Sequence, residues 1–261
     1  MKKLCACLIV LGVIVGAGVA SAAELMPDFA TVPTGWYTDR YAPQSFTNVG
    51  SFEGRNNVLG IGITSAGGFD ARPAAYQSTF YNTQGMGYTI SGGAGSTISA
   101  ELYIPSSWGI PADGSVRTDM WGVLTDASSA VSGYPIIGFT NYGGFTGYRV
   151  WDDTNGVWID IAKTVKYNGW TAFSIEFTGT SYEFFINNQL VYTNTSVNGS
   201  TGFSEVIMQA YNFYGDPSLT GTVPVDYTAH WANTPVPIPG ALWLLGSGLV
   251  GLAGLRRRCR K

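Results

Sequence analysis

The chain has 261 residues, with 14 lysines and arginines against 17 aspartates and glutamates. Two of the basic residues lie at the N-terminus and five in the last six residues, so residues 24–234 hold seven basic and 17 acidic side chains. Their net charge is close to −10, which argues against nucleic acid and anionic lipid as partners. All 3 cysteines lie in the terminal segments, so residues 24–234 can form no disulfide and no thiolate metal site.

Residues 1–22 have the features of a secretory signal peptide. Lys2 and Lys3 precede an apolar run over residues 4–19, and Ala20-Ser21-Ala22 supplies a small-residue cleavage site. A retained membrane anchor is the alternative, but no basic stop-transfer cluster follows the run. We therefore expect export, with cleavage near Ala22 and residues 24–234 delivered outside the cytoplasm.

Residues 24–234 are predicted to form one all-β domain. Short apolar and β-branched runs alternate there with glycine, asparagine, aspartate and proline, and no long stretch has a helical period. An antiparallel β-sandwich suits this pattern. The expected strands are a hairpin over 46–63, then 78–90, 97–104, 121–124, 148–151, 157–161, 170–177, 182–186, 189–193 and 225–231, with residues 105–118 as a loop.

The clearest hairpin joins residues 148–151 to 157–161 across a turn that contains Asn155-Gly156. Asn-Gly in a short turn is the strongest local hairpin signal. Because strand side chains alternate, a regular turn places two tryptophans and a charged pair on one face: Arg149, Trp151, Trp158 and Asp160. The opposite face can fill the core with Val150, Val157, Ile159 and Ile161.

Two readings of this hairpin remain open. Two indoles beside a charged pair have the composition of a carbohydrate platform, because sugar C–H groups lie on aromatic rings while hydroxyls need polar partners. The alternative is cross-strand stacking that only stabilises the sheet, worth about 0.2–1 kcal/mol. Tryptophan pairs in sandwiches often have this structural role.

The run from Gly169 to Phe177, followed by Asn187-Asn188-Gln189-Leu190-Val191-Tyr192, resembles the concanavalin A-like or laminin G-like jelly roll. Residues 225–231 are similar to the closing strand of those folds. The resemblance spans about 60 residues and implies an antiparallel β-sandwich. It also implies a carbohydrate- or protein-binding surface, with calcium or glycosidase activity in some members.

Catalysis is not expected. A retaining glycosidase needs two closely spaced carboxylates, but no Glu-x-Asp-x-x-Glu-like run occurs. Asp152 and Asp153 are adjacent and so point oppositely, and Glu176 and Glu183 lie on different strands. His230 is the only histidine, which excludes a two-histidine metal site. We therefore predict that the domain is not an enzyme, with a glycoside hydrolase as a lesser alternative.

No cofactor is expected, and bound calcium is the alternative. Asp152, Asp153 and Asn155 could supply oxygens to Ca²⁺, which needs six to eight of them. Aspartate and asparagine also stabilise turns through their own backbone. We favour the turn role.

The last 27 residues, 235–261, form a separate segment with three parts. A proline-rich spacer leads into an apolar stretch that ends at Leu255, and a basic cluster completes the chain. From Ile238 this stretch has 18 residues, about 27 Å as a helix, which is close to the hydrocarbon core of about 30 Å. Basic residues beside a span stay cytoplasmic, so the predicted transmembrane helix runs from outside to inside, in agreement with the signal peptide.

The tail resembles the PEP-CTERM sorting signal of exosortase substrates. The resemblance covers roughly the last 25 residues: the spacer, Gly-Ala-Leu-Trp-Leu-Leu-Gly-Ser-Gly-Leu and the terminal arginines. The corresponding sorting motif is Val236, Pro237, Ile238 and Pro239, with isoleucine where the family name has glutamate. The residues that orient the span are Arg256, Arg257, Arg258 and Arg260. The resemblance implies a Gram-negative, exopolysaccharide-producing bacterium and an exosortase-type sorting protease that releases the protein from the inner membrane.

The sequence therefore predicts an exported cell-surface or extracellular-matrix protein, sorted through its tail. Its non-catalytic sandwich would bind carbohydrate, with exopolysaccharide as the expected partner. The alternative is a structural matrix component that binds no small ligand.

Overall fold

The computed structural model describes residues 23–77, 83–109 and 115–235. The predicted signal peptide, the sorting motif Val236–Pro239 and the arginines Arg256, Arg257, Arg258 and Arg260 lie outside the described residues. No helix within the described ranges is long and apolar enough to cross a membrane. The expected transmembrane helix falls on residues outside them, so it stays a prediction.

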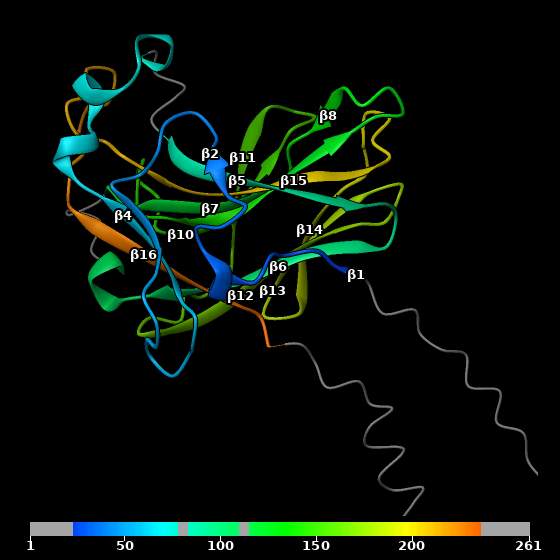
Figure 1. Ribbon diagram of the computed structural model, residues 1–261, viewed down its shortest axis with the longest axis horizontal. Helices are drawn as coiled ribbons and strands as arrows, with labels where there is room; N and C mark the ends of the chain where they lie inside the picture. The colour runs from blue at the N-terminus through cyan, green and yellow to red at the C-terminus, as the bar shows by residue number, and fades with distance from the viewer. Residues whose placement is uncertain (1–22, 78–82, 110–114, 236–261) are drawn as a thin grey trace, which may run out of the picture.

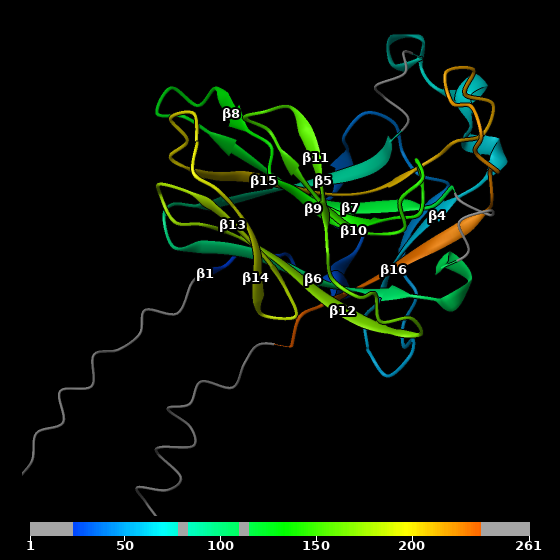
Figure 2. The same ribbon diagram turned by 180° about the vertical axis from the view of Figure 1, so that it is seen from behind.

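Two β-sheets lie face to face and form a sandwich (Figures 1 and 2). Sheet A contains, in spatial order, β14 (Gln189–Asn194), β13 (Tyr182–Ile186), β12 (Gly169–Phe177), β6 (Ser96–Ile104), β16 (Tyr227–Asn233), β4 (Leu59–Ile63) and β3 (Ser45–Asn48), with β1 (Ala23–Glu24) beside β6. Sheet B contains β11 (Val157–Ile161), β10 (Gly147–Asp152), β9 (Ile136–Thr140), β7 (Arg117–Thr125), β15 (Gly202–Tyr211), β5 (Thr83–Gly92) and β2 (Tyr37–Thr38), with β8 (Val131–Gly133) beside β7.

The strand pairs of both sheets are antiparallel apart from β1 with β6, which confirms the predicted all-β antiparallel sandwich. Many neighbours in space, such as β7 and β15, are far apart in sequence, as in jelly-roll folds. The described residues contain no α-helix. Their short 3-10 turns are η1 (Phe29–Thr31), η2 (Ser65–Gly67), η3 (Phe69–Ala71), η4 (Ala74–Tyr76) and η6 (Ser106–Gly109).

The core forms where the inner faces of the two sheets meet. In β12, Phe173, Ile175 and Phe177 are buried while the residues between them are partly exposed, because successive side chains of a strand point to opposite faces. Trp231 of β16 is fully buried, and its Nε1 donates to Thr118 Oγ1 at 3.0 Å. The polar atom of this large core side chain therefore has a partner.

A layer of loops is fixed by one buried ion pair. The turns η2 to η4 (cyan in Figure 1) lie beside the segment that precedes β16 (orange). Arg72 Nη1 lies 2.9 Å from Asp216 Oδ2, and both side chains are fully buried. Arg72 Nη2 also donates to the backbone carbonyl of Asn212 at 3.1 Å. These contacts join loops that are about 140 residues apart in the chain.

The two ends of the domain meet at Ser99 in β6. The Ser99 hydroxyl donates to the Glu24 carboxylate and lies 2.5 Å from Thr234 Oγ1. Ile98 and Ala100 point into the core, so Ser99 lies on the outer face of sheet A. The chain therefore enters and leaves the domain on the side opposite the outer face of sheet B.

One sequence expectation about strands is wrong in part, and two strands were not expected. Residues 105–118 were predicted as a loop, but β7 begins at Arg117 and the segment Ser106–Gly109 is a 3-10 turn. The strands β9 and β15 were not predicted. All five residues of β9 are buried, and so are most residues of β15, so neither strand shows the alternation of a half-exposed strand.

Candidate functional site

The β10–β11 hairpin places its four candidate residues together. Trp151 lies opposite Trp158 and Arg149 lies opposite Asp160, which is the register expected for a regular turn. The two indole rings are 5.1 Å apart at an interplanar angle of 52°. Arg149 Nη2 lies 2.9 Å from Asp160 Oδ1.

The opposite face of the hairpin differs from expectation at one position. Val150 is fully buried and Ile161 nearly so, while Ile159 packs partly against the core. Val157 was also expected in the core, but it is 44% exposed. It begins β11, the edge strand of sheet B, where no further strand covers it.

The tryptophan pair belongs to a longer row that crosses sheet B. The registers of neighbouring strands place one residue of each strand side by side: Trp158, Trp151, Ile136, Trp121, Ile207, Gly87 and Tyr37. We call these residues the aromatic row. Residues paired across neighbouring strands lie side by side, with the strands about 4.8 Å apart. The row therefore runs perpendicular to the strands along the outer face of the sheet.

A second row of polar residues lies two positions further along each strand. The registers align Asp160, Arg149, Gly138, Asp119, Gln209 and Gly85. We call these residues the polar row. Side chains two positions apart share a face, so the aromatic row and the polar row lie side by side on the outer face of sheet B.

Arg117 links the two rows. Its guanidinium carbon lies 3.9 Å from the ring centroid of Trp158 and 3.8 Å from that of Tyr211. Its Nε donates to Asp119 Oδ2 at 2.8 Å. Burial raises the pKa of the Asp119 carboxyl, and the charge of Arg117 opposes that rise.

The middle of the aromatic row is covered by Arg40, from the loop after β2. Its guanidinium lies 5.0 Å from the Trp121 ring, 2.6 Å from Asp39 and 3.2 Å from Gln209 Oε1. Trp121 is only 9% exposed, whereas Tyr37 at one end of the row is 43% exposed. The row is thus open at its ends and closed in its centre.

An acidic group lies at the β2 end of the row. Burial, and then the hydrogen bond to Glu205, raise the pKa of Tyr37 to about 12. Burial also raises the pKa of Glu205, and the hydrogen bond from Tyr37 partly offsets that rise. Gly87 lies beneath both side chains, where a Cβ would collide with Glu205 Oε1 and the Tyr37 ring.

Sequence reasoning missed the β7 part of this face because residues 105–118 were predicted as a loop. The available signal was the alternation of Arg117, Asp119 and Trp121, three large side chains at period two. Such alternation predicts a strand, and the structure places all three on the outer face of sheet B.

The calcium candidates form a network of hydrogen bonds at the hairpin turn. Asp152 Oδ1 accepts from the backbone N–H groups of Thr154 and Asn155 and from Asn194 Nδ2, at 3.0–3.1 Å. Asp152 Oδ2 accepts from Asn155 Nδ2 and the Tyr192 hydroxyl, both at 2.7 Å. A cation would have to displace these donors, so the geometry favours the turn role. Within the described ranges, no group of three or more histidine, cysteine, aspartate or glutamate side chains could hold a metal ion.

The other candidate acid–base residues lie on the outer face of sheet A. Glu176 lies directly opposite Glu183 on neighbouring strands. His230 stacks on Phe52 with 3.9 Å between ring centroids, and burial lowers its pKa. None of the three belongs to either row on sheet B.

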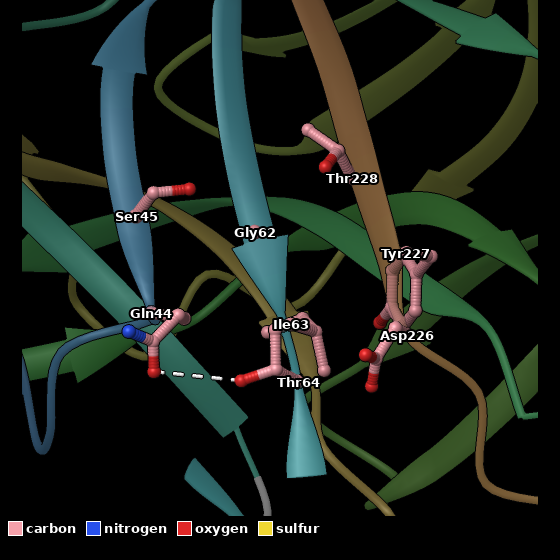
Figure 3. A pocket seen from close by; sticks show the side chains of 8 residues that line it. All are labelled: Gln44, Ser45, Gly62, Ile63, Thr64, Asp226, Tyr227 and Thr228. Carbon is pink, nitrogen blue, oxygen red and sulfur yellow. Dashed lines mark hydrogen bonds between the residues drawn. The ribbon is translucent and has the colours of Figure 1, made fainter. Parts of the chain in front are cut away.

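A pocket of about 260 Å³ lies at the edge of sheet A (Figure 3). Gln44, Ser45, Gly62, Ile63, Thr64, Asp226, Tyr227 and Thr228 line it. The Thr64 hydroxyl donates to Gln44 Oε1 at 3.4 Å, and Asp226 Oδ1 accepts from the Ser65 N–H at 3.2 Å. These two hydrogen bonds join the loops next to β3, β4 and β16. The pocket is separate from the two rows on sheet B.

No family model matches the chain, and no curated protein matches it. Among solved structures, a β-glucanase of Bacillus licheniformis is 13% identical with a TM-score of 0.44, covering 78% of this chain and 93% of its own. A glycoside hydrolase family 16 endo-glucanase from Bacteroides ovatus is 11% identical with a TM-score of 0.47, covering 78% and 97%. The carbohydrate binding module CBM66 from Bacillus subtilis is 14% identical with a TM-score of 0.37, covering 77% and 93%.

These comparisons contradict the prediction that the domain is not an enzyme, because glycoside hydrolases recur among the solved chains of similar shape. The prediction relied on the absence of a carboxylate pattern along one strand. Strand pairing shows why that test is too narrow, since it sets Glu176 directly opposite Glu183 although seven positions separate them in sequence. Carboxylates far apart in sequence can therefore become neighbours.

Proposed function

We propose that the β-sandwich binds carbohydrate along the outer face of sheet B. The observation that carries the proposal is the aromatic row with the polar row beside it. Aromatic faces present apolar surface to sugar C–H groups, while neighbouring charged side chains donate to and accept from hydroxyls. A face that crosses seven strands suits an extended chain of sugars better than a single one.

The exposed parts of the face lie at its two ends. Trp151 and Trp158 are half-buried, and the Asp160 side chain is 47% exposed. At the other end, Tyr37 is open to solvent. A glycan would therefore meet the hairpin end and the β2 end of the row first.

We also propose that the protein is exported and displayed with this face directed outward. The signal peptide and the PEP-CTERM-like tail support export and sorting by an exosortase-type protease to the cell surface or extracellular matrix. Thr234 leaves the domain on the outer face of sheet A. A tail anchored in the inner membrane before processing would thus leave the aromatic row facing away from the attachment point, toward exopolysaccharide.

The test compares two tryptophans on opposite sides of the sandwich. Trp151→Ala removes a ring from the aromatic row, and Trp170→Ala removes a half-buried ring from the outer face of sheet A. Retention on immobilised exopolysaccharide and the melting temperature are measured for both variants. We expect Trp151→Ala alone to weaken retention, by about tenfold or about 1.4 kcal/mol.

Equal retention by both variants and the wild type, with lowered melting temperatures, would leave the row with a structural role only. Release of oligosaccharides from the same polymers is measured in parallel. Turnover by the wild type would replace a binding function with a hydrolytic one.

A further inference from the structure

The guanidinium groups on the outer face of sheet B are already neutralised. Each arginine lies within 3 Å of a carboxylate: Arg149 with Asp160 at 2.9 Å, Arg117 with Asp119 at 2.8 Å and Arg40 with Asp39 at 2.6 Å. Glu205 adds a fourth carboxyl, hydrogen-bonded to Tyr37. Among the residues that the structure describes, this face therefore has four carboxyls and three guanidiniums.

The pairs of Arg117 and Arg149 are fixed in place, so an incoming anion cannot easily recruit either arginine. Arg117 is stacked between Trp158 and Tyr211, and its partner Asp119 is fully buried. Turning Arg117 away would leave a buried carboxylate uncompensated, which is strongly unfavourable. The Arg149 guanidinium lies 5.5 Å from the Phe145 ring and 5.7 Å from the Trp158 ring, and its side chain is only 12% exposed.

Neutral hydroxyl groups fit the same face well. A guanidinium beside a carboxylate offers N–H donors and lone-pair acceptors side by side, and a hydroxyl can both donate and accept. Two buried donors, Arg117 Nη2 and Trp121 Nε1, have no hydrogen-bond partner among the described residues. A glycan hydroxyl oxygen that reaches either donor would supply the missing acceptor.

We propose that the aromatic row selects neutral glycans and discriminates against glycans that carry carboxylate, sulfate or phosphate groups. This inference rests on the proposed carbohydrate-binding function and adds the chemical class of its ligand. The net charge of residues 24–234, close to −10, acts in the same direction at long range. Asp160 sets the selectivity at the open end of the row, because its carboxylate is the exposed member of the Arg149 pair.

The experiment uses matched pairs of polymers and two charge variants. A β-glucan, a mannan and a galactan are each presented alone and after oxidation of the C6 hydroxyl to a carboxylate. Asp160→Asn removes one negative charge beside the aromatic row. Glu183→Gln removes one negative charge on the outer face of sheet A, far from the row.

We expect the wild type to bind at least one neutral polymer about tenfold more tightly than its oxidised form, because close like charges repel. Asp160→Asn should raise affinity for that oxidised polymer severalfold, while Glu183→Gln should leave it unchanged. Equal or tighter binding of the oxidised polymer by the wild type would overturn the inference, as would equal gains in both variants. Binding to none of the polymers would overturn the proposed function itself.

Discussion

Asp152 is the point at which the β10–β11 hairpin is joined to the opposite sheet. Its side chain points inward from β10 and accepts hydrogen bonds from Tyr192 and Asn194 of β14. Three side-chain donors would lose this acceptor in Asp152→Ala: Tyr192, Asn194 and Asn155. The two backbone donors of the turn lie nearer solvent, so water can replace their partner.

The expected destabilisation follows from those three bonds. At about 1 kcal/mol for each side-chain hydrogen bond, the loss is about 3 kcal/mol. For a domain of this size each kcal/mol lowers the melting temperature by about 2–4 °C, which gives a decrease of about 6–12 °C. Thermal unfolding followed by circular dichroism measures it directly.

The matched control is Asp126→Ala. Asp126 also accepts from turn N–H groups, those of Ser128 and Ala130, at 2.8 and 3.0 Å. Its turn lies on the surface, so water replaces the lost acceptor and we expect a much smaller decrease. Equal decreases in the two variants would refute the claim that Asp152 joins the sheets.

Three other outcomes are expected. Burial raises the pKa of Asp152, but the hydrogen bonds it accepts from Asn155 and Tyr192 outweigh burial and hold that pKa below its usual value. The stabilisation that the ionised Asp152 side chain provides should therefore fade as the pH falls below about 4. The difference in melting temperature between wild type and Asp152→Asn should narrow over the same pH range. A protein comprising residues 24–234 should melt at one temperature with and without reductant, because it contains no cysteine; a shift with reductant would contradict the domain boundaries. Mass spectrometry of the released protein should detect no peptide upstream of about Ala22 and none from the terminal arginines, and an intact tail would contradict sorting.

The parts of the structure that could be predicted depend on local pattern. Asn155-Gly156 predicts the turn that pairs Trp151 with Trp158, and the alternation through β12 predicts which of its side chains enter the core. Both are properties of a few consecutive residues. For the same reason, the hairpin end of the candidate site could be named from the sequence.

The rest of the site depends on the order of strands, which local pattern does not determine. Trp121 and Tyr37 join Trp151 in one row only because β9 lies between β10 and β7, and because β15 and β5 separate β7 from β2. The strand β15, which carries Gln209 and Ile207, is buried on both faces and shows little alternation. A central strand of this kind cannot be distinguished by periodicity from other buried segments.

Glycines within the strands explain how such large side chains fit on one face. A Cβ at Gly138 would collide with the Thr118 carbonyl and the Asp119 carboxylate, and one at Gly85 would lie 2.8 Å from Gln209 Cβ. The polar row thus has one glycine after each pair of large side chains. A glycine inside a strand is unfavourable for the strand itself and often marks a close approach of neighbouring groups. Its presence beside Asp119 indicates that the carboxylate needs this space, because a larger residue would push Asp119 away from Arg117 and break the ion pair that holds the two rows together.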